Sequence, residues 1–290
     1  MKKLLILSGK GGTGKTTTAA AFIGFAKAEA FADCDVDAPN LHLVVQMDTM
    51  PEQTVYYGSQ KATIQPEKCA GCGLCASACR FHAIRFEAGR YAVNEYACEG
   101  CGVCAYVCPQ QAVTLENDIA GTQTLYRGNR VFSTATLRMG RGNSGKLVAA
   151  VKTALSEAAP DKELAIIDGS PGIGCPVIAS ISGVNLVLIV AEPSLSGFSD
   201  MKRILKTAAI LGTRTVVCVN KADVSLGNTE AIEQFCEARG ILFVGRILFD
   251  HQASMAINAG MSLADVPCPA RGALQKVYAQ TMKQLQGGAA

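Results

Sequence analysis

The sequence predicts a doubly wound α/β fold with a mainly parallel sheet, into which a small α+β domain is inserted. Apolar runs typical of buried strands alternate with amphipathic helical stretches, which favours a parallel sheet covered by helices. In the middle of the chain, two short cysteine runs interrupt this alternation. We therefore expect residues 1–62 and 118–290 to form one α/β domain and residues 63–117 to form the insert.

Length, composition and charge limit the classes of function. The chain has 290 residues, of which 49% are hydrophobic, and a net charge of +3. That charge is too small to indicate a nucleic-acid partner, and we expect none. The first apolar run is short and leads into a glycine-rich loop, so it predicts a strand rather than a signal peptide. No run of about 18 apolar residues predicts a transmembrane helix. Thirteen cysteines without an export signal indicate a reducing, cytoplasmic location.

The N-terminal strand, residues 3–7, leads into the glycine-rich segment GKGGTGKTT at residues 9–17, and an alanine-rich helical stretch follows. The pattern G-x4-G-K-[ST] between a strand and a helix is a P-loop. Its backbone N–H groups and the helix N-terminus favour phosphate binding. We expect Lys15 to reach the β- and γ-phosphates and the Thr16 hydroxyl to ligate Mg²⁺. The nucleotide-binding residues predicted in this loop are Gly11, Gly12, Thr13, Gly14, Lys15, Thr16 and Thr17.

Carboxylates follow two of the predicted strands. Asp33, Asp35 and Asp37 alternate after a short apolar step, so on an extended chain they share one face. A Ca²⁺ loop is disfavoured because its glycine and distal glutamate are missing. Beside a P-loop, these acids instead predict a switch that orients Mg²⁺ and the attacking water. The strand over residues 163–168 ends at Asp168 in a Walker B pattern, whose acid holds Mg²⁺ through water.

The cysteine runs share the spacing C-x2-C-x2-C-x3-C, which is that of bacterial ferredoxins. Three thiolates of a run at this spacing bind one [4Fe–4S] cluster, and the fourth binds the other cluster. Cluster I is therefore assigned to Cys69, Cys72, Cys75 and Cys108. Cluster II is assigned to Cys98, Cys101, Cys104 and Cys79. The expected cofactors are these two [4Fe–4S] clusters and ATP with Mg²⁺.

The rest of the chain predicts further strands and helices. A hairpin is expected over residues 122–137, with its turn at Gly128 and Asn129. The remaining strands are expected at 83–86, 91–93, 112–115, 186–191, 215–219 and 241–244, and the helices at 146–158, 199–211, 228–239, 252–259 and 272–285. The last helix has one apolar face, which fits a membrane surface. Core packing is favoured over membrane contact by about three to one, because surface helices usually bury such a face.

With these residues together, the chain resembles the MinD/ParA/Mrp group of P-loop ATPases, and within it the subgroup with an inserted bacterial ferredoxin domain. The resemblance covers essentially the whole chain. It rests on segments 10–16, 33–40, 142–148 and 168–176. One departure is Arg80, which follows Cys79 where the family usually has proline, and this change could shift the potential of one cluster.

The resemblance implies roles for individual residues. Lys10 looks like the signature lysine of a deviant Walker A loop, which reaches across a homodimer to the partner's nucleotide. Asp35 would position the hydrolytic water, and Asp33 and Asp168 would support Mg²⁺. Asn220 is similar to the family's adenine-reading asparagine, although N-K-x-D is also a guanine-reading motif. Two further residues, Pro267 and Pro269, would lie near the base. The implied assembly is an ATP-dependent dimer with slow ATPase activity without its partner.

Three functions are open at this point. In the first, ATP-driven dimer closure is coupled to electron transfer through the clusters to a redox partner. In the second, the protein is an iron–sulfur carrier. The carriers of the Mrp type use a Cys-x-x-Cys pair that is missing after residue 108 here, although Cys175 from two subunits could bridge a cluster. In the third, the protein is a MinD-like positioning switch that binds a partner or membrane when it holds ATP.

Overall fold

The computed structural model describes residues 1–287, which divide into two compact units. The first unit consists of Met1–Gln53, Gln123–Thr136 and the chain from Ser144 onward. The second unit consists of Thr54–Thr122 and Leu137–Asn143. This unit extends beyond the expected insert on both sides, because it includes parts of the strands Glu52–Tyr57 and Ile119–Tyr126, which lead into and out of the insert.

A nine-stranded sheet forms within residues 1–287, in the order β13-β12-β11-β1-β10-β2-β9-β8-β3. The strands are β1 (Lys2–Leu7), β2 (Ala30–Asp33), β3 (Glu52–Tyr57), β8 (Ile119–Tyr126), β9 (Val131–Leu137), β10 (Leu164–Asp168), β11 (Leu186–Ala191), β12 (Arg214–Asn220) and β13 (Leu242–Ile247). Neighbouring strands from β13 to β9 run parallel. The short connection between β8 and β9 makes the expected hairpin, since a parallel crossover needs a longer connection.

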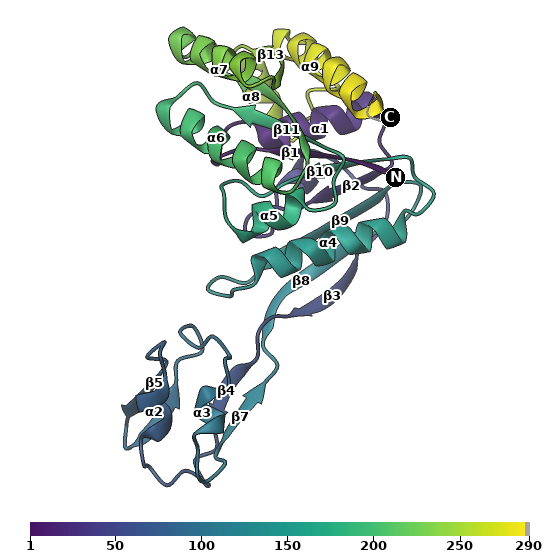
Figure 1. Cartoon of the computed structure of the whole chain (residues 1–290). Helices are drawn as coiled ribbons and strands as arrows, with labels where there is room; N and C mark the ends of the chain where they lie inside the picture. Colours follow the sequence, from purple (N-terminus) through teal and green to yellow (C-terminus); the bar gives the residue numbers. More distant parts are fainter. Residues whose placement is uncertain (288–290) are drawn as a thin grey trace. The chain divides into compact units, whose positions relative to one another are not determined.

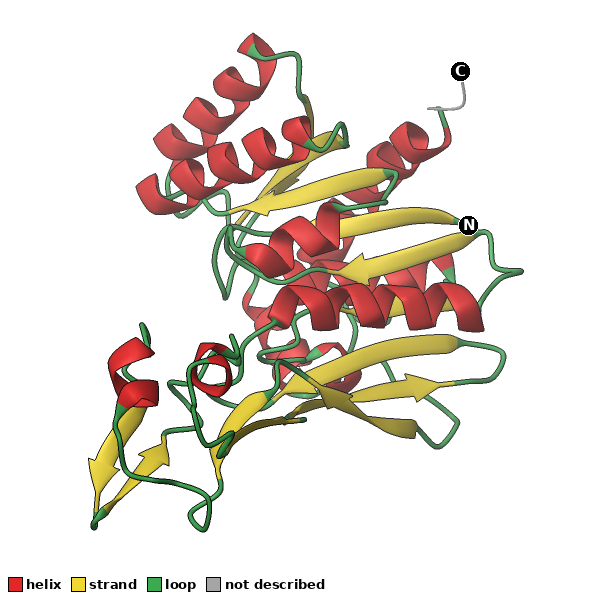
Figure 2. Ribbon diagram, turned by 60° about the horizontal axis from the view of Figure 1, so that its bottom comes forward, coloured by secondary structure: helices red, strands yellow, loops and turns green. Residues whose placement is uncertain are grey.

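Helices cover both faces of this sheet (Figure 1 and Figure 2). They are α1 (Lys15–Ala26), α4 (Ser144–Ala158), α5 (Cys175–Ile181), α6 (Leu195–Ile210), α7 (Leu226–Ala238), α8 (His251–Asn258) and α9 (Pro269–Gln286). The crossover through α1 leads from β1 toward β2, whereas those through α5, α6 and α7 lead in the opposite direction along the sheet. Right-handed crossovers therefore place α1 on one face and α5 to α7 on the other. The doubly wound fold expected from the sequence is confirmed.

The apolar face of α9 packs into the core of the first unit. Leu274, Val277 and Leu285 are buried there, and the ring of Tyr278 lies edge-on to Phe22 of α1. This arrangement confirms core packing for that face. None of the helices in residues 1–287 combines the length and the apolar character needed to cross a membrane.

The second unit has a small core of its own. Strands β4 (Lys61–Ile64) and β7 (Val113–Glu116) pair antiparallel, as do β5 (Ile84–Glu87) and β6 (Arg90–Val93). Two short helices, α2 (Leu74–Ala78) and α3 (Val103–Tyr106), each begin just after a glycine of a cysteine run. The core consists of small and apolar side chains together with several of the cysteines.

Strands β3 and β4 and helices α2, α3 and α5 were not predicted from the sequence. Strand β3 is exposed along most of its length, so it lacks the alternation of apolar residues that marks a half-buried strand. Helix α5 follows a glycine- and proline-rich loop and has Pro176 in its first turn. Proline is common in the first turn of a helix. Because three glycines precede it closely here, the sequence pattern predicted that the loop continues.

Candidate functional site

The P-loop and the two key acids meet at one edge of the sheet. Ile6 of β1 is opposite Asp168 of β10, and Asp168 is opposite Asp33 of β2. The carboxyl ends of these three neighbouring parallel strands therefore lie together, which is where open α/β sheets bind ligands. The structure thus brings together the P-loop and the acids that the sequence analysis placed in one site.

Lys15 is the centre of a buried ionic network. It is the first residue of α1 and is 5% exposed. Its Nζ lies 2.6 Å from Oδ1 of Asp168, 3.3 Å from Oγ1 of Thr16 and 3.8 Å from Oδ2 of Asp35. The Thr16 hydroxyl donates to the other oxygen of Asp168 at 2.6 Å. Burial lowers the pKa of Lys15, but Asp168, Asp33 and Asp35 together raise it above its ordinary value, so the ammonium stays charged.

Asp33 shapes the loop that carries Asp35. Its carboxylate accepts backbone N–H bonds from Asp35 at 3.0 Å and from Asn40 and Leu41 at 2.9 Å each. Burial, together with the charge of Asp168, raises the pKa of Asp33 to about 7. A carboxylate has about four lone-pair sites, and these bonds already use three of them. The predicted contact of Asp33 with Mg²⁺ would therefore have to use the site that remains.

We expect the pH dependence of unfolding to report Asp33. Its pKa of about 7 lies above the value of about 3.9 for an unfolded aspartate, so the folded protein binds this proton more tightly. The contribution of Asp33 to stability therefore falls as the pH rises from about 4 to about 7. Thermal unfolding followed by circular dichroism between pH 5 and 8 tests this. Asp33→Asn should flatten the slope of Tm against pH, whereas Asp37→Asn, an exposed acid of the same loop, should not. Equal slopes in all three proteins would refute the assignment.

Lys10 is held by an acid of its own chain. It forms an ion pair with Glu192, which follows β11, and its Nζ lies 3.3 Å from Oγ of Ser194. Lys221 lies 3.9 Å from the same glutamate and donates to the carbonyl of Gly12 at 3.1 Å. Glu192 thus holds two lysines beside the P-loop. This role of Glu192 was not predicted, because one glutamate after a strand matches no motif.

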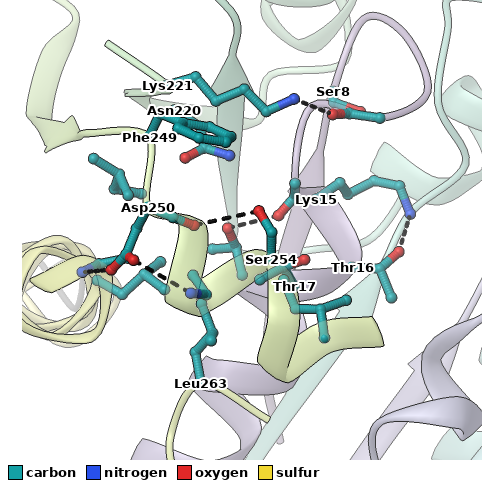
Figure 3. A pocket seen from close by; sticks show the side chains of 18 of the residues that line it. Ser8, Lys15, Thr16, Thr17, Asn220, Lys221, Phe249, Asp250, Ser254 and Leu263 are labelled. Atoms are coloured by element: carbon teal, nitrogen blue, oxygen red, sulfur yellow. Dashed lines mark hydrogen bonds between the residues drawn. The ribbon is translucent and has the colours of Figure 1, made fainter. Parts of the chain in front are cut away.

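A cavity of about 340 Å³ continues from the P-loop toward the end of β13. Asn220 borders it, and its Nδ2 donates to the carbonyl of Thr13 at 2.8 Å. Figure 3 shows Asn220 and Phe249 on one side of the pocket, with Lys15 and Thr16 on the other. The volume lies in the range of natural small-ligand sites, about 300–1,000 Å³.

The outer wall of this pocket was not predicted. It includes Leu248, Phe249 and Asp250 from the connection between β13 and α8. Asp250 accepts the N–H groups of Gln252 and Ala253 in α8, and that of Ala270 in α9, so it ties the starts of two helices together. An aspartate just before the helix expected at 252–259 was a usable signal for a helix cap. Pro267 and Pro269 were expected near the base, but the lining from this part of the chain comes from Ala270 and Leu274.

The loop has the features that a bound phosphate needs. Among residues 1–287, no heavy atom beyond those of each glycine and its two chain neighbours lies within 4 Å of the positions where Cβ atoms of Gly11 and Gly12 would stand, which leaves an open cradle. Gly14 has φ +92°, and a Cβ there would lie 2.3 Å from Nδ2 of Asn220. The buried hydroxyl of Thr13 has no hydrogen-bond partner in the described part of the chain. The residues present therefore fit a nucleotide with its cation.

In the second unit, cysteines of both runs line one cavity. Cys69, Cys72 and Cys75 of the first run are joined there by Cys108 of the second run, with Tyr91 beside them. Burial raises the pKa of Cys75, and the neighbouring Cys69 and Cys108 thiols raise it further. These four residues are the set assigned to cluster I.

Of the four cysteines assigned to cluster II, three are close to one another in the structure. Burial raises the pKa of Cys104, with contributions from Cys98 and Cys101. Helix α2 carries Cys75 of the first run and α3 carries Cys104 of the second run, and these two helices pack against each other. Every cysteine of the chain lies within residues 1–287, and all of them are free.

A [4Fe–4S] cluster needs a wider arrangement of ligands than a single metal ion does. Within residues 1–287, no three His, Cys, Asp or Glu side chains converge as the ligands of one metal ion would. A [4Fe–4S] cluster binds each thiolate through a different iron, so its four ligands are spread around a larger body. Four thiols with largely apolar neighbours are the set of donors that such a group needs.

Comparison with known proteins agrees with both parts of this description. Residues 62–115 match the family model of a 4Fe–4S dicluster domain. The uncharacterized protein MJ0578 of Methanocaldococcus jannaschii is 33% identical over 224 residues, which is 76% of this chain and 78% of MJ0578. The chain belongs to the MJ0578 family. MJ0579 of the same organism is 27% identical over 283 residues, with 83% of this chain and 92% of MJ0579 covered.

Solved structures show the fold of this MJ0578-family protein. MinD of Pyrococcus horikoshii complexed with Mg-ADP matches with a TM-score of 0.59 at 17% identity, covering 99% of this chain and 97% of that one. The cell division ATPase MinD of Pyrococcus furiosus gives 0.58 at 18% identity, with 97% and 98% covered. A ParA family ATPase of Chlorobium tepidum gives 0.54 at 14% identity, with 97% and 98% covered. The MinD/ParA fold with a dicluster insert, expected from the sequence, is confirmed.

Proposed function

We propose that this protein binds and hydrolyses ATP with Mg²⁺, and that an ATP-dependent homodimer switch controls electron transfer through two [4Fe–4S] clusters to a partner protein. The observation that carries the proposal is the presence of both sites in one chain. A charged P-loop pocket lies in the unit with the MinD/ParA fold, and the other unit is a dicluster domain. The Mg-ADP bound by MinD of P. horikoshii supports the choice of nucleotide.

The ionic network suggests how the nucleotide site works. Lys15 neutralises Asp168 and lies near Asp35. With Lys15 turned to a phosphate, Asp168 and Thr16 would be free to hold Mg²⁺, which would supply charge stabilisation for phosphoryl transfer. Asp35, whose backbone N–H is held by Asp33, then orients water. Lys10 leaves Glu192 to reach the nucleotide of a second subunit.

Redox coupling is tested by EPR of the reduced protein with MgATP, with MgADP and without nucleotide. We expect MgATP to change the cluster spectrum and to change the rate at which an acceptor dye reoxidises the clusters, while size-exclusion chromatography shows a dimer. MgADP should have neither effect. Identical spectra and rates under all conditions, with ATP binding shown by calorimetry, would refute the coupling.

A second function, transfer of whole clusters, is favoured by one observation. Cys175 is exposed at the start of α5, directly after the loop that follows Asp168. Cys34, Cys218 and Cys236 are buried instead. A thiol in that place is available to a second subunit. Transfer of iron to an acceptor protein that lacks its cluster, lost in Cys175→Ala, would support this carrier function over electron transfer. ATP-dependent binding to liposomes would instead support a positioning switch.

A further inference from the structure

The two sets of cysteines receive different numbers of backbone hydrogen bonds. In the cluster II set, Sγ of Cys98 accepts the N–H of Ala62 at 3.5 Å, and Sγ of Cys79 accepts that of Ala83 at 3.4 Å. In the cluster I set, Sγ of Cys108 accepts the N–H of Ala112 at 3.3 Å. Among residues 1–287, the structure therefore gives cluster II two N–H···S bonds and cluster I one.

A half-buried lysine adds to this difference. Lys61 of β4 donates from Nζ to the carbonyl of Cys98, so its ammonium lies beside a cluster II ligand. Glu116 is its cross-strand neighbour in β7, but the two side chains do not form an ion pair. The cavity of the cluster I cysteines is lined instead by Tyr91, with Ile64 and Val113.

Besides Lys61, Arg141 is half-buried in this unit, but it is paired with Glu95 and Asp118, and the charged residues next to the cysteines in the sequence are exposed. Glu67 and Lys68 precede the cluster I ligand Cys69, and their charges are opposite. Arg80 and Glu99 each follow a ligand of cluster II, and their charges are also opposite. Solvent and salt screen exposed charges much more than partly buried ones. Lys61 is therefore the charge that distinguishes the two sites.

We infer that cluster II has the higher reduction potential of the two clusters and that Lys61 sets much of the difference. Reduction adds one negative charge to a cluster and its thiolates. Hydrogen bonds to sulfur and a nearby cation stabilise that negative charge and therefore raise the reduction potential of the cluster. Apolar side chains around a cluster do not stabilise the charge. An electron given to cluster I by a one-electron donor passes to cluster II, which reoxidises cluster I and reduces cluster II. The inference rests on the proposed clusters, and it makes cluster II the place where the electron is held.

The test is a redox titration of the full chain, reconstituted without oxygen and reduced with titanium(III) citrate while EPR is recorded. The wild-type protein should show two separate one-electron steps. Lys61→Met removes the charge and keeps the apolar stem, so the step at higher potential should move down while the other stays. Lys61→Arg should keep both steps. Lys68→Met, at an exposed lysine beside a cluster I ligand, should move neither.

The assignment of the steps uses one ligand variant for each cluster. Cys72→Ala should leave only the step at higher potential, and Cys101→Ala only the step at lower potential. The reverse result, or unchanged potentials in Lys61→Met and in Lys61→Gln, would overturn the inference. Iron analysis comes first. A reconstituted protein without iron would refute the proposed function, whereas about eight irons with two equal potentials would refute only this inference.

Discussion

Replacing Lys15 with alanine should weaken ATP binding by about 100-fold or more and abolish turnover. The expectation follows from the loss of the only ammonium at the first turn of α1, because hydrogen bonds from a charged donor are worth about 1.5–3 kcal/mol each. Equilibrium binding of a fluorescent ATP analogue and phosphate release are the measurements. Undiminished binding would remove Lys15 from the nucleotide site.

Loss of stability must be separated from loss of binding in this variant. Lys15 is the counterion of the buried Asp168 and lies near Asp33 and Asp35. Removing one partner of a buried ion pair costs about 3–5 kcal/mol, since the other charge is left uncompensated. The double variant Lys15→Ala/Asp168→Asn should therefore regain much of the stability but not the ATP binding. Lys10→Ala is the matched control in the same loop, because it should keep binding and lose turnover. Recovery of binding in the double variant would contradict the role given to Lys15.

The central part of the nucleotide site could be predicted because its residues are neighbours in sequence or end adjacent strands. The P-loop is one continuous segment, and Asp168 and Asp33 are marked by the apolar strands before them. The role of Asp33 was harder to predict, because its three hydrogen bonds depend on how the following loop folds back.

Other parts of the site arise only when distant segments meet. Phe249 and Asp250 form a pocket wall because β12 and β13 are adjacent in the sheet, which no local pattern indicates. Glu192 can pair with Lys10 because it follows strand β11, which lies next to β1, and Lys10 is in the loop after β1. Lys61 contacts a cysteine 37 residues further along the chain. Such contacts follow from the topology, so composition and spacing could not reveal them.

The crossed arrangement of cysteines predicts which pairs of substitutions act on the same cluster. Cys79 and Cys101 come from different runs but are assigned to one cluster, whereas Cys79 and Cys72 share a run and are assigned to different clusters. Cys79→Ala and Cys101→Ala should each lower the iron content from about eight to about four, because each removes a ligand of cluster II. Combined, the two substitutions should again leave about four irons.

The second double variant reverses this result. Cys79→Ala with Cys72→Ala removes a ligand from each cluster, so it should leave little iron and no EPR signal in the reduced protein. Ligation within each run would give the opposite pattern, with about four irons in the same-run pair and almost none in the other. The two double variants carry the same number of substitutions in the same small unit, so a general loss of folding would affect both. A difference between them can therefore come only from the way the two runs share their ligands. The presence of Cys108 in the cavity of the first run favours the crossed result.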